Sequence, residues 1–456
     1  MSDATPSLAL FTDLYQLTMA QAYWQSGTTA PATFSLFFRG YPPNRGYMVF
    51  AGLLDVLDYL ERFRFTPADM EYLRSTNKFE GRFLDWLEGL RFTGSVRAMA
   101  EGTLFFPNEP VIEVTAPVIE AQLVETYLLN QVNVQSLLAT KAARVVYAAR
   151  GRSLVDFAAR RTQGTDAALK LARVSYMIGF SGTSNVMAGA LYGIPTFGTM
   201  AHSFVTCFAS EADSFRAYAA SFPDTSTFLV DTYETIQGVR NAVQVAREMK
   251  EKGHILQAVR LDSGDMLRLS LEARKLLDEA ELQDVDIFAS GGLDEYQVEE
   301  LLEAGAPIDG FGVGTKVGVS GDAPWTDCAY KLVEYDGQPV LKLSTGKQTL
   351  PGQKQVYRYS GPDGMYTHDV IACADEGPSE DGAKPLLQEV MRDGKRLERP
   401  SALRDLRERF AQEFARLSAS HKALRNPARY RVETSPALER LRRQVTQQIV
   451  QKELGE

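Results

Sequence analysis

The chain has 456 residues, of which 45% are hydrophobic and 23% are charged, a composition typical of a globular protein. A chain of this length is longer than the chains that usually fold around a single hydrophobic core, so we expect two domains. The formal net charge of −9 disfavours a nucleic-acid partner, because phosphate backbones are bound by basic surfaces. Arginines between residues 392 and 443 alternate with acidic residues at helical spacing, which indicates a solvated helical face rather than a basic patch.

No segment of the sequence is typical of a membrane anchor or a signal peptide. No stretch approaches the roughly 20 apolar residues of a membrane span, and Met1–Pro6 lacks a cationic region before an apolar run. The widely spaced Cys207, Cys328 and Cys373 predict reduced thiols rather than a disulfide or a metal site. We therefore expect a cytoplasmic protein with no membrane partner.

Strand and turn patterns alternate over the first 120 residues. Thr33–Phe38 alternates like a strand and precedes a turn-rich cluster ending at Gly46. Further strands are expected within Phe92–Ala100 and Gly102–Ile119. An apolar stripe at helical spacing lies between the first of these strands and the other two. It is formed by Leu53, Val56, Leu57 and Leu60.

Short apolar runs, each followed by polar residues or glycines, recur through the middle of the chain. They predict six strands: Leu154–Asp156, Ile194–Phe197, Thr227–Val230, Gln257–Leu261, Asp286–Ala289 and Asp309–Gly312. Amphipathic helices between them, such as the one that ends before Gly253, require a parallel sheet with right-handed crossovers. Reactive residues always follow the strand, as in the active site of a β/α barrel, so we expect an enzyme.

Strand and turn patterns return beyond Gly321. The turn Asp336-Gly337 between Tyr330–Tyr335 and Val340–Leu343 predicts a hairpin, and two terminal helices are expected at Arg404–Ser418 and Pro436–Leu454. The fold class is therefore α/β. We expect an irregular or incomplete β/α (TIM-like) barrel over residues 121–320, inserted in a smaller α/β sandwich domain built from residues 1–120 and 321–456. Six strands are fewer than the eight of a closed barrel, so the sequence does not decide whether the barrel is closed.

Two glycine-rich turns follow the last two expected strands. Gly291 and Gly292 lie in the first, and Gly314 and Thr315 end the second. Glycines let backbone N–H groups approach an anion, and the last strand–helix loops of a barrel are its common phosphate site. These turns predict a phosphate site, although glycine also serves ordinary tight turns. Arg160, which follows the first expected strand, is a further candidate for phosphate.

Two carboxylates, Asp262 and Asp265, come directly after a strand. Oxygen ligands suit Mg²⁺, which binds proteins through one or two carboxylates plus substrate phosphates, so Asp262 is a candidate metal ligand. Asp265 has an equally plain role as the cap of the following helix. Arg260 is expected to point into the same site and to bind a carboxylate or phosphate; an ion pair with Asp231 or Asp262 is the alternative.

His202 is the one histidine of four that follows an expected barrel strand. No second ligand stands at zinc spacing and no G-x-S-x-G motif is present, so the sequence implies neither a zinc centre nor a serine hydrolase of that type. The alternative role for His202 is to cap an expected helix over Ser203–Ala220.

Taken together, these motifs are similar to those of the nicotinate phosphoribosyltransferases, and the resemblance covers nearly the whole chain. Any one motif is ordinary, but the ordered set is specific. The matching segments are Phe11–Met19, Gly182–Asn185, Gly198–Val205, Arg260–Asp265, Phe311–Thr315, Tyr330–Glu334 and Pro351–Arg358.

The resemblance implies transfer of phosphoribose from phosphoribosyl pyrophosphate to nicotinate, with ATP as co-substrate. His202 would be the phosphorylated residue, and Asp231 would orient it through one ring nitrogen. The nicotinate-binding residues implied are Tyr15 from a partner subunit of a homodimer, Phe157, Thr199 and Arg260. The implied phosphate-binding residues are Arg39, also from the partner, and Gly291, Gly292, Gly314 and Thr315. Core packing is the alternative for the two aromatic residues.

Two alternatives to this activity differ in substrate or in class. The nicotinamide enzyme of the same fold carries an aspartate where this chain has Ser184; a carboxylate there would repel nicotinate, so Ser184 favours the acid. A catalytically silent barrel that binds a nucleotide and regulates another process is the second alternative. The presence of His202, Asp231 and Asp262 disfavours it.

Overall fold

The computed structural model describes residues 7–343 and 349–455, so the expectation concerning Met1–Pro6 lies outside the described residues. The chain forms two compact units: one from the residues up to Leu137 together with those from Trp325 onward, and one from Leu138–Pro324. The first change of unit falls inside helix α6 (Glu125–Ala149), where no turn interrupts the sequence. The borders at 120 and 320 therefore stay a prediction.

Both ends of the chain build the sheets of the first unit. β1 (Pro31–Phe38) pairs antiparallel with β12 (Cys328–Tyr335) on one side and β5 (Pro110–Pro117) on the other. The whole sheet has the order β13 (Gln338–Pro339), β12, β1, β5, β3 (Ser95–Ala98), β17 (Gln388–Arg392) and β18 (Lys395–Arg396). A four-stranded sheet has the order β16 (Lys384–Pro385), β14 (Lys354–Ser360), β15 (Tyr366–Cys373) and β19 (Arg431–Thr434). β2 (Met48–Val49) pairs with β4 (Leu104–Phe105).

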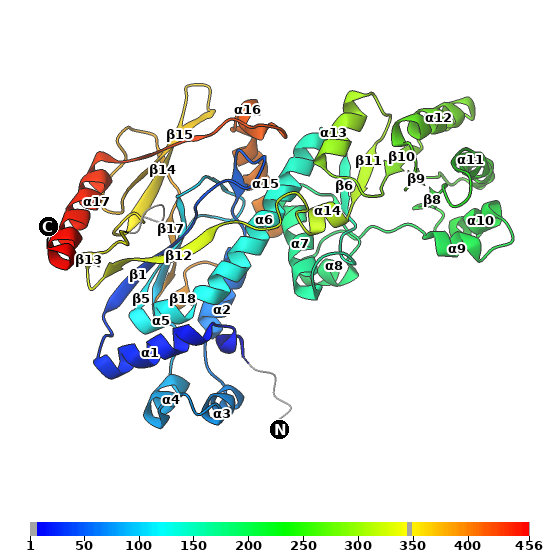
Figure 1. Cartoon of the computed structure of the whole chain (residues 1–456). Coiled ribbons are helices and arrows are strands. Elements are labelled where there is room, and N and C mark those ends of the chain that lie inside the picture. The colour runs from blue at the N-terminus through cyan, green and yellow to red at the C-terminus, as the bar shows by residue number, and fades with distance from the viewer. Residues whose placement is uncertain (1–6, 344–348, 456) are drawn as a thin grey trace. The chain divides into compact units, whose positions relative to one another are not determined.

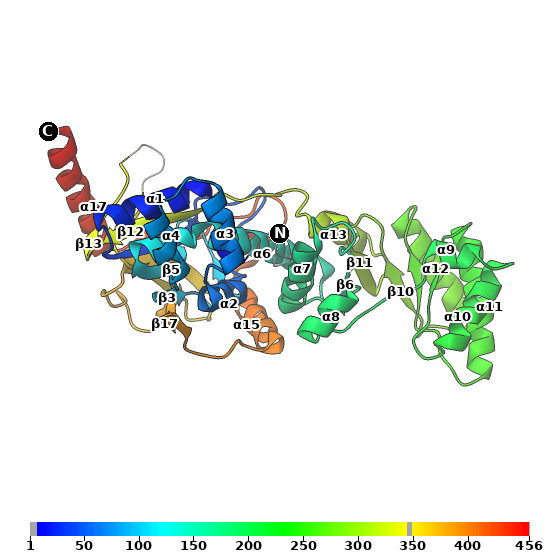
Figure 2. The same cartoon turned by 90° about the horizontal axis from the view of Figure 1, so that it is seen from below.

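The helices of this unit cover the sheets or pair with one another. α5 (Val118–Leu123) packs on β1 and β5, α17 (Pro436–Ile449) packs on β15, and α3 (Pro67–Ser75) lies beside α4 (Gly81–Glu88) (Figures 1 and 2). The others are a short turn at Leu8–Leu10, α1 (Leu14–Ser26), α2 (Leu53–Arg62), α15 (Leu403–Ala415), α16 (Ala419–Lys422) and a last turn at Val450–Leu454. The helical stripe expected from Leu53 to Leu60 is confirmed, because its four members are buried in α2.

The expected hairpin is present, but its second strand is displaced. Asp336 and Gly337 both have positive φ, 49° and 70°, as a two-residue hairpin turn requires. This tight turn places Gln338 directly opposite Tyr335, so the strand runs over Gln338–Pro339 and not over Val340–Leu343.

The second unit is a parallel sheet with the order β7 (Gly182–Thr183), β6 (Ser153–Asp156), β11 (Gly310–Val313), β10 (Asp286–Ala289), β9 (Ala258–Leu261) and β8 (Thr227–Leu229). Five of the six expected strands are confirmed to within about a residue at each end. The expectation for Ile194–Phe197 is wrong: it contributes one bridge, Thr196 to Thr183, because Pro195 offers no N–H to a ladder. β7 takes its place and was missed, because two residues carry no alternating pattern.

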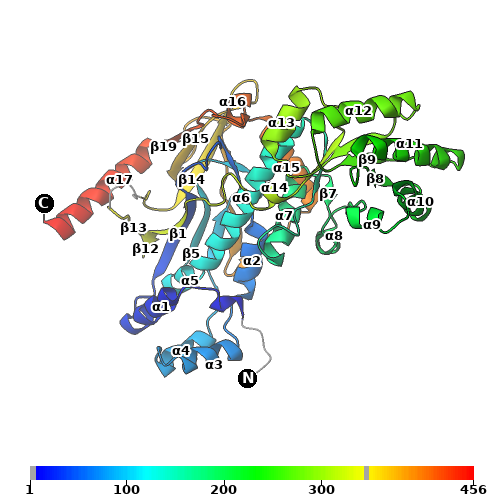
Figure 3. The same cartoon turned by 45° about the vertical axis from the view of Figure 1, so that its right-hand side comes forward.

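Helices connect the strands and lie around the outside of the sheet, with α10, α11 and α12 packed in succession (Figures 1 and 3). They are α7 (Thr165–Ile178), α8 (Val186–Tyr192), α9 (His202–Thr206), α10 (Glu211–Ser221), α11 (Thr235–Glu251), α12 (Met266–Glu279), α13 (Glu295–Glu303) and α14 (Thr315–Gly318). Within the described residues no ladder joins β8 to the Thr196 segment, so the strands follow one another as in a barrel but the sheet stays open.

The described part of the chain contains no helix with the length and apolar character needed to cross a bilayer. Cys207, Cys328 and Cys373 are free thiols.

Candidate active site

Arg260 is the centre of a hydrogen-bonded cluster at the carboxyl ends of the parallel strands. Its guanidinium donates from Nε to Ser290 Oγ (2.8 Å), from Nη1 to Thr199 Oγ1 (2.9 Å) and from Nη2 to Asp262 Oδ1 (2.6 Å). It also lies over the ring of Phe157, 5.3 Å from the centroid. The ion pair with Asp262, left open by the sequence, is therefore formed. Arg260 has five N–H donors, so two remain for a bound anion.

Asp262 accepts two of its hydrogen bonds at one oxygen. Oδ1 receives Arg260 and the hydroxyl of Ser290 (2.5 Å). Burial opposes ionisation of Asp262, but the hydrogen bond from Ser290 and the charge of Arg260 outweigh it and lower the pKa of the carboxyl. Asp262 is consequently ionised near neutral pH, and Oδ2 faces His202 Nε2 at 4.0 Å.

A divalent cation fits this carboxylate only as part of a substrate complex. No group of three or more His, Cys, Asp or Glu residues that could hold a metal occurs within residues 7–343 and 349–455. Mg²⁺ commonly binds through one or two carboxylates and completes its shell with water and substrate phosphates. Ionised Asp262, 30% exposed, suits that mode. Asp265 instead caps α12 by accepting from the N–H of Arg268, which confirms its alternative role.

His202 is the first residue of α9 and does not cap a helix. Ala201 is the cap, and the single helix expected over 203–220 is divided into α9 and α10. The imidazole Nδ1 lies 3.1 Å from the hydroxyl of Thr232, and Nε2 lies 4.0 Å from both Asp231 Oδ1 and Asp262 Oδ2. The ring, 45% exposed, thus has a hydroxyl on one nitrogen and two carboxylates facing the other.

Asp231 is held rigidly but has one oxygen without a partner. Oδ2 accepts from the N–H of Asp262 (3.1 Å) and from Ser263 Oγ (2.6 Å). Oδ1 is buried and accepts no hydrogen bond from the described residues. A buried unpaired carboxylate oxygen is unfavourable. It faces His202 Nε2, so a small movement of the ring would satisfy it. The direct hydrogen bond implied by the family resemblance is not formed at 4.0 Å.

The two glycine-rich turns are connected to each other. Lys316, in α14 after the second turn, donates to Asp294 Oδ2 and Gln297 Oε1, both at 2.9 Å. Asp294 in turn caps α13, directly after the first turn. The Thr315 side chain at the start of α14 is exposed. The structure therefore brings four of the predicted phosphate-binding residues, Gly291, Gly292, Gly314 and Thr315, into one linked pair of loops.

Gly291 and Gly292 both have positive φ, 96° and 70°, but differ in their surroundings. A Cβ at Gly291 would lie 1.9 Å from the carbonyl oxygen of Asp262, whereas a Cβ at Gly292 would have no atom within 4 Å. Gly291 lets the loop lie against the strand end that carries Asp262. Gly292 faces open space, where a ligand can approach the backbone.

Asp156 and Thr232 were missed by the sequence reasoning. The carboxylate of Asp156 accepts from the N–H of Ala158 and the hydroxyl of Thr183, and burial raises its pKa. The backbone carbonyl of Asp156 accepts from the N–H of Ser184, so Asp156 orders the turns that carry both Phe157 and Ser184. Asp156 is the last residue of β6 and Thr232 lies in the loop after β8, and this position at the carboxyl side of a strand is the feature that could have identified them.

Three predicted site residues do not join this cluster. Arg160 is exposed. Tyr15 and Arg39 belong to the other unit, where Tyr15 accepts a hydrogen bond from Gln16 and Arg39 pairs with Asp327 at 2.7 Å. Their roles stay predictions.

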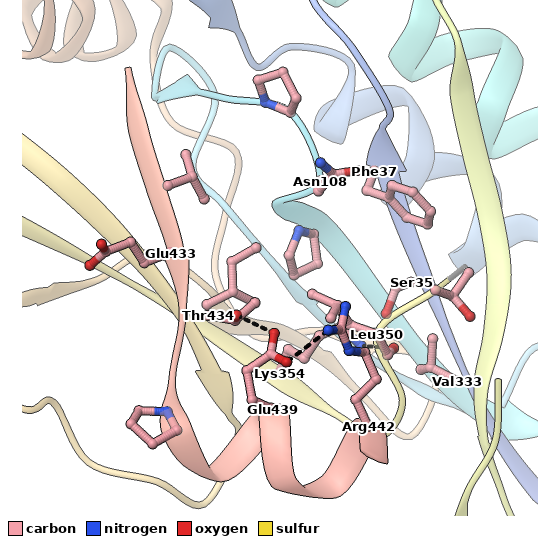
Figure 4. A pocket seen from close by; sticks show the side chains of 16 residues that line it. Ser35, Phe37, Asn108, Val333, Leu350, Lys354, Glu433, Thr434, Glu439 and Arg442 are labelled. Atoms are coloured by element: carbon pink, nitrogen blue, oxygen red, sulfur yellow. Dashed lines mark hydrogen bonds and ion pairs between the residues drawn. The ribbon is translucent and has the colours of Figure 1, made fainter. Parts of the chain in front are cut away.

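A cavity of about 740 Å³ lies in the first unit and is not the centre of this chemistry (Figure 4). Its buried cation, Lys354, donates to the carbonyls of Gly352 (2.6 Å) and Leu350 (3.3 Å) and lies 3.2 Å from Glu113 Oε1. Burial lowers the pKa of Lys354. These three acceptors use the three N–H donors of the ammonium group, so none is left for a phosphate. The other cation of the lining, Arg442, is paired with Glu439 at 2.8 Å.

Comparisons with known proteins identify the family of the chain. Residues 10–133, 152–355 and 353–442 match the N-terminal domain, the family and the C-terminal domain described as nicotinate phosphoribosyltransferase (NAPRTase). The chain belongs to the nicotinate phosphoribosyltransferase family. It is 53% identical to nicotinate phosphoribosyltransferase pncB2 of Mycobacterium tuberculosis over 389 residues, 85% of this chain and 83% of the relative.

More distant members of this nicotinate phosphoribosyltransferase family cover almost the entire chain. The human nicotinate phosphoribosyltransferase is 34% identical, with 95% of each chain covered. A crystal structure of human nicotinic acid phosphoribosyltransferase superposes with a TM-score of 0.86 at 33% identity, covering 96% of this chain and 99% of that one. The family and the α/β fold class expected from the sequence are therefore confirmed.

The contrast between the two glycines gives a first prediction. Gly291→Ala should lower the free energy of unfolding of this unit by about 2–5 kcal/mol, from strained φ and from the clash with Asp262. Gly292→Ala, the matched control, should lose only the roughly 1–2 kcal/mol due to positive φ. Denaturant unfolding followed by far-ultraviolet circular dichroism measures both losses. Circular dichroism is chosen over tryptophan fluorescence because all three tryptophans (Trp24, Trp86 and Trp325) belong to the other unit. Equal losses would contradict the geometry.

Proposed function

We propose that this chain transfers phosphoribose from phosphoribosyl pyrophosphate to nicotinate, giving nicotinate mononucleotide and pyrophosphate, and that ATP hydrolysis drives the reaction through a phosphohistidine at His202. This makes the chain a glycosyltransferase with the energy coupling of a ligase, in NAD salvage. The observation that carries the ATP step is the unpaired, buried Oδ1 of Asp231 facing the imidazole.

The tautomer of His202 follows from the charges around its ring. Two carboxylates face Nε2, so the proton is favoured there and Nδ1 keeps its lone pair. Nδ1 would attack the γ-phosphorus of ATP, forming an N–P bond as the bond from phosphorus to the β-phosphate oxygen breaks and ADP leaves. Asp231 and Asp262 would stabilise the positive charge that the ring gains. Water would later cleave the N–P bond and release phosphate.

The transfer itself needs alignment and charge stabilisation more than proton transfer. The pyridine nitrogen of nicotinate is unprotonated near neutral pH and can form the bond to C1 of the ribose as the bond to pyrophosphate breaks. The ribosyl carbon passes through an oxocarbenium-like state, as in other glycosyl transfers. We assign the carboxylate of nicotinate to the two remaining donors of Arg260 and to Thr199, with its ring on Phe157.

Phosphate binding is assigned to the linked glycine loops. Backbone N–H groups of Gly291, Gly292 and Gly314 and the hydroxyl of Thr315 would bind the 5-phosphate. Arg160 and Arg39 would contact further phosphate groups. Asp262 would hold Mg²⁺, which when bound offsets the charge of the departing pyrophosphate.

Two exposed apolar surfaces support a homodimer with shared active sites. Leu8, Phe11, Leu14 and Tyr15 are 45–55% exposed in the first unit, and Val186, Met187 and Leu191 are 56–75% exposed on α8 in the second. Apolar side chains gathered in this way mark association surfaces. We assign them to a second copy of this chain, whose Tyr15 would complete the nicotinate site opposite Phe157 and whose Arg39 would contact phosphate.

The alternatives differ in measurable ways. Ser184 lies on the turn ordered by Asp156, and its neutral hydroxyl does not repel a carboxylate, which favours nicotinate over nicotinamide. A silent nucleotide-binding protein would show neither transfer nor phosphorylation.

The wild-type protein should form nicotinate mononucleotide from nicotinate and phosphoribosyl pyrophosphate, faster with ATP and far more slowly with nicotinamide. [γ-³²P]ATP should label it to about one phosphate per chain, and His202→Ala should lose both the label and the stimulation by ATP. Chromatography of products and phosphate counting make these measurements. Absence of label in the wild type would remove the ATP-coupling step, and absence of transfer would remove the proposed activity.

Arg260→Ala should raise the KM for nicotinate by about tenfold or more while changing the KM for phosphoribosyl pyrophosphate much less, because a charged hydrogen bond contributes about 1.5–3 kcal/mol. Arg260→Lys keeps the charge but loses the planar fork, and should recover only part of the affinity. Steady-state kinetics with each substrate varied in turn separates the effects. Equal effects on both substrates would show that Arg260 is misassigned.

Shared sites predict complementation between two defective chains. Tyr15→Ala and His202→Ala should each lose the ATP-stimulated activity alone, whereas co-expressed chains purified through two different tags should recover about half of the wild-type ATP-stimulated activity, because one of the two sites in a mixed C2 dimer has both residues intact. Activity per chain and sedimentation of the purified pair test this. A monomer, or a dimer without recovery, would contradict shared sites.

A further inference from the structure

Four ionisable side chains form a buried cluster next to the first glycine loop. Lys141 and Arg144 come from α6, Glu295 is the first residue of α13, and Asp322 follows α14. Lys141 Nζ lies 2.6 Å from Glu295 Oε2 and 2.7 Å from Asp322 Oδ1, and Arg144 Nε lies 2.8 Å from Glu295 Oε1. Their side chains are 1%, 1% and 0% exposed for Lys141, Arg144 and Glu295, and 27% for Asp322.

Such a cluster is poorly explained as a source of stability. Two cations and two carboxylates balance in charge, but removing them from water costs several kcal/mol per ion, and apolar residues of equal volume often stabilise as well or better. What ion pairs of this kind do provide is a fixed geometry, because breaking one leaves an uncompensated buried charge. The position fixed here is the start of α13.

The start of α13 is connected to both glycine loops. Glu295 directly follows Asp294, which caps the helix and binds Lys316 of the second loop at 2.9 Å. Gly292 lies three residues before Glu295 in the sequence. Arg144 extends the cluster by donating from Nη2 to the hydroxyl of Tyr296 (2.9 Å). The rest of the loops depends on turns that glycine leaves flexible, so the ion cluster is their rigid support.

We propose that Glu295, with Lys141, Arg144 and Asp322, positions the glycine loops and thereby sets the affinity for the phosphorylated substrate. These are positioning residues, because they act through Asp294, Lys316 and the loop backbone rather than by touching the substrate. The inference rests on the proposed function, since it assigns phosphate to these loops. Lys141 lies near the start of this unit and Asp322 near its end. Their ion pair therefore connects the ion cluster to both the first and the last segment of the unit.

The same two helices offer a matched control. Arg150, directly after α6, pairs with Glu303 at the end of α13 at 2.9 Å, but these side chains are 48% and 58% exposed. Exposed ion pairs contribute little to stability, because water already screens their charges. Glu295→Gln and Glu303→Gln therefore make the same chemical change in the same helix, at the buried and the exposed pair.

Glu295→Gln should raise the KM for phosphoribosyl pyrophosphate by about tenfold or more, since displacement of binding groups by about 1 Å can lower rates by up to about a hundredfold. The KM for nicotinate and the labelling of His202 by ATP should change less than about twofold. Glu303→Gln should leave all three unchanged. Asp322→Asn, at the partly exposed member, should give a smaller rise in the same direction and keeps the test available if Glu295→Gln does not fold.

A uniform rise in every Michaelis constant, or a loss of stability with no change in KM for phosphoribosyl pyrophosphate, would overturn the positioning role. An inactive wild type would instead overturn the proposed function. The two failures are therefore distinguishable within one set of assays.

Discussion

Asp262 joins the ends of three neighbouring strands, and the candidate active site depends on that connection. Its N–H donates to Asp231 after β8, its Oδ1 accepts from Arg260 in β9, and the same oxygen accepts from Ser290 after β10. Parallel strands bring their carboxyl ends to one edge of the sheet, but without such cross-links the loops there would be free to separate. Ionised Asp262 therefore has a structural role besides any contact with substrate.

The arrangement of charge separates two tasks within a few ångströms. On one side, Arg260 keeps donors available beside an aromatic face, which suits a flat ring with a carboxylate. On the other side, two carboxylates face His202 Nε2, while the hydroxyl of Thr232 lies 3.1 Å from Nδ1. Asp262 contacts Arg260 and faces His202.

Two further groups of interactions hold the loops that carry the site residues. Asp156 orders the turns that carry Phe157 and Ser184, and the buried cluster around Glu295 holds the helix that follows Gly291 and Gly292. Both use charged groups where apolar packing would suffice for stability alone. Hydrogen bonds fix direction as well as distance, which apolar contacts do not, and this suits loops that must present backbone N–H groups to a ligand.

The sequence by itself determined the family, five of the parallel strands and the cap that starts α12. Asp265 and Asp294 cap helices because a short acidic side chain reaches N–H groups two or three residues away, so neighbours in the chain suffice to predict them. Only the tertiary structure decided that Arg260 pairs with Asp262 rather than Asp231, that Asp231 keeps an unpaired oxygen towards His202, and that Glu295 meets Lys141. These contacts compete with others of the same chemistry, and the choice among them is made by distances of a few ångströms that exist only once the distant segments have packed together.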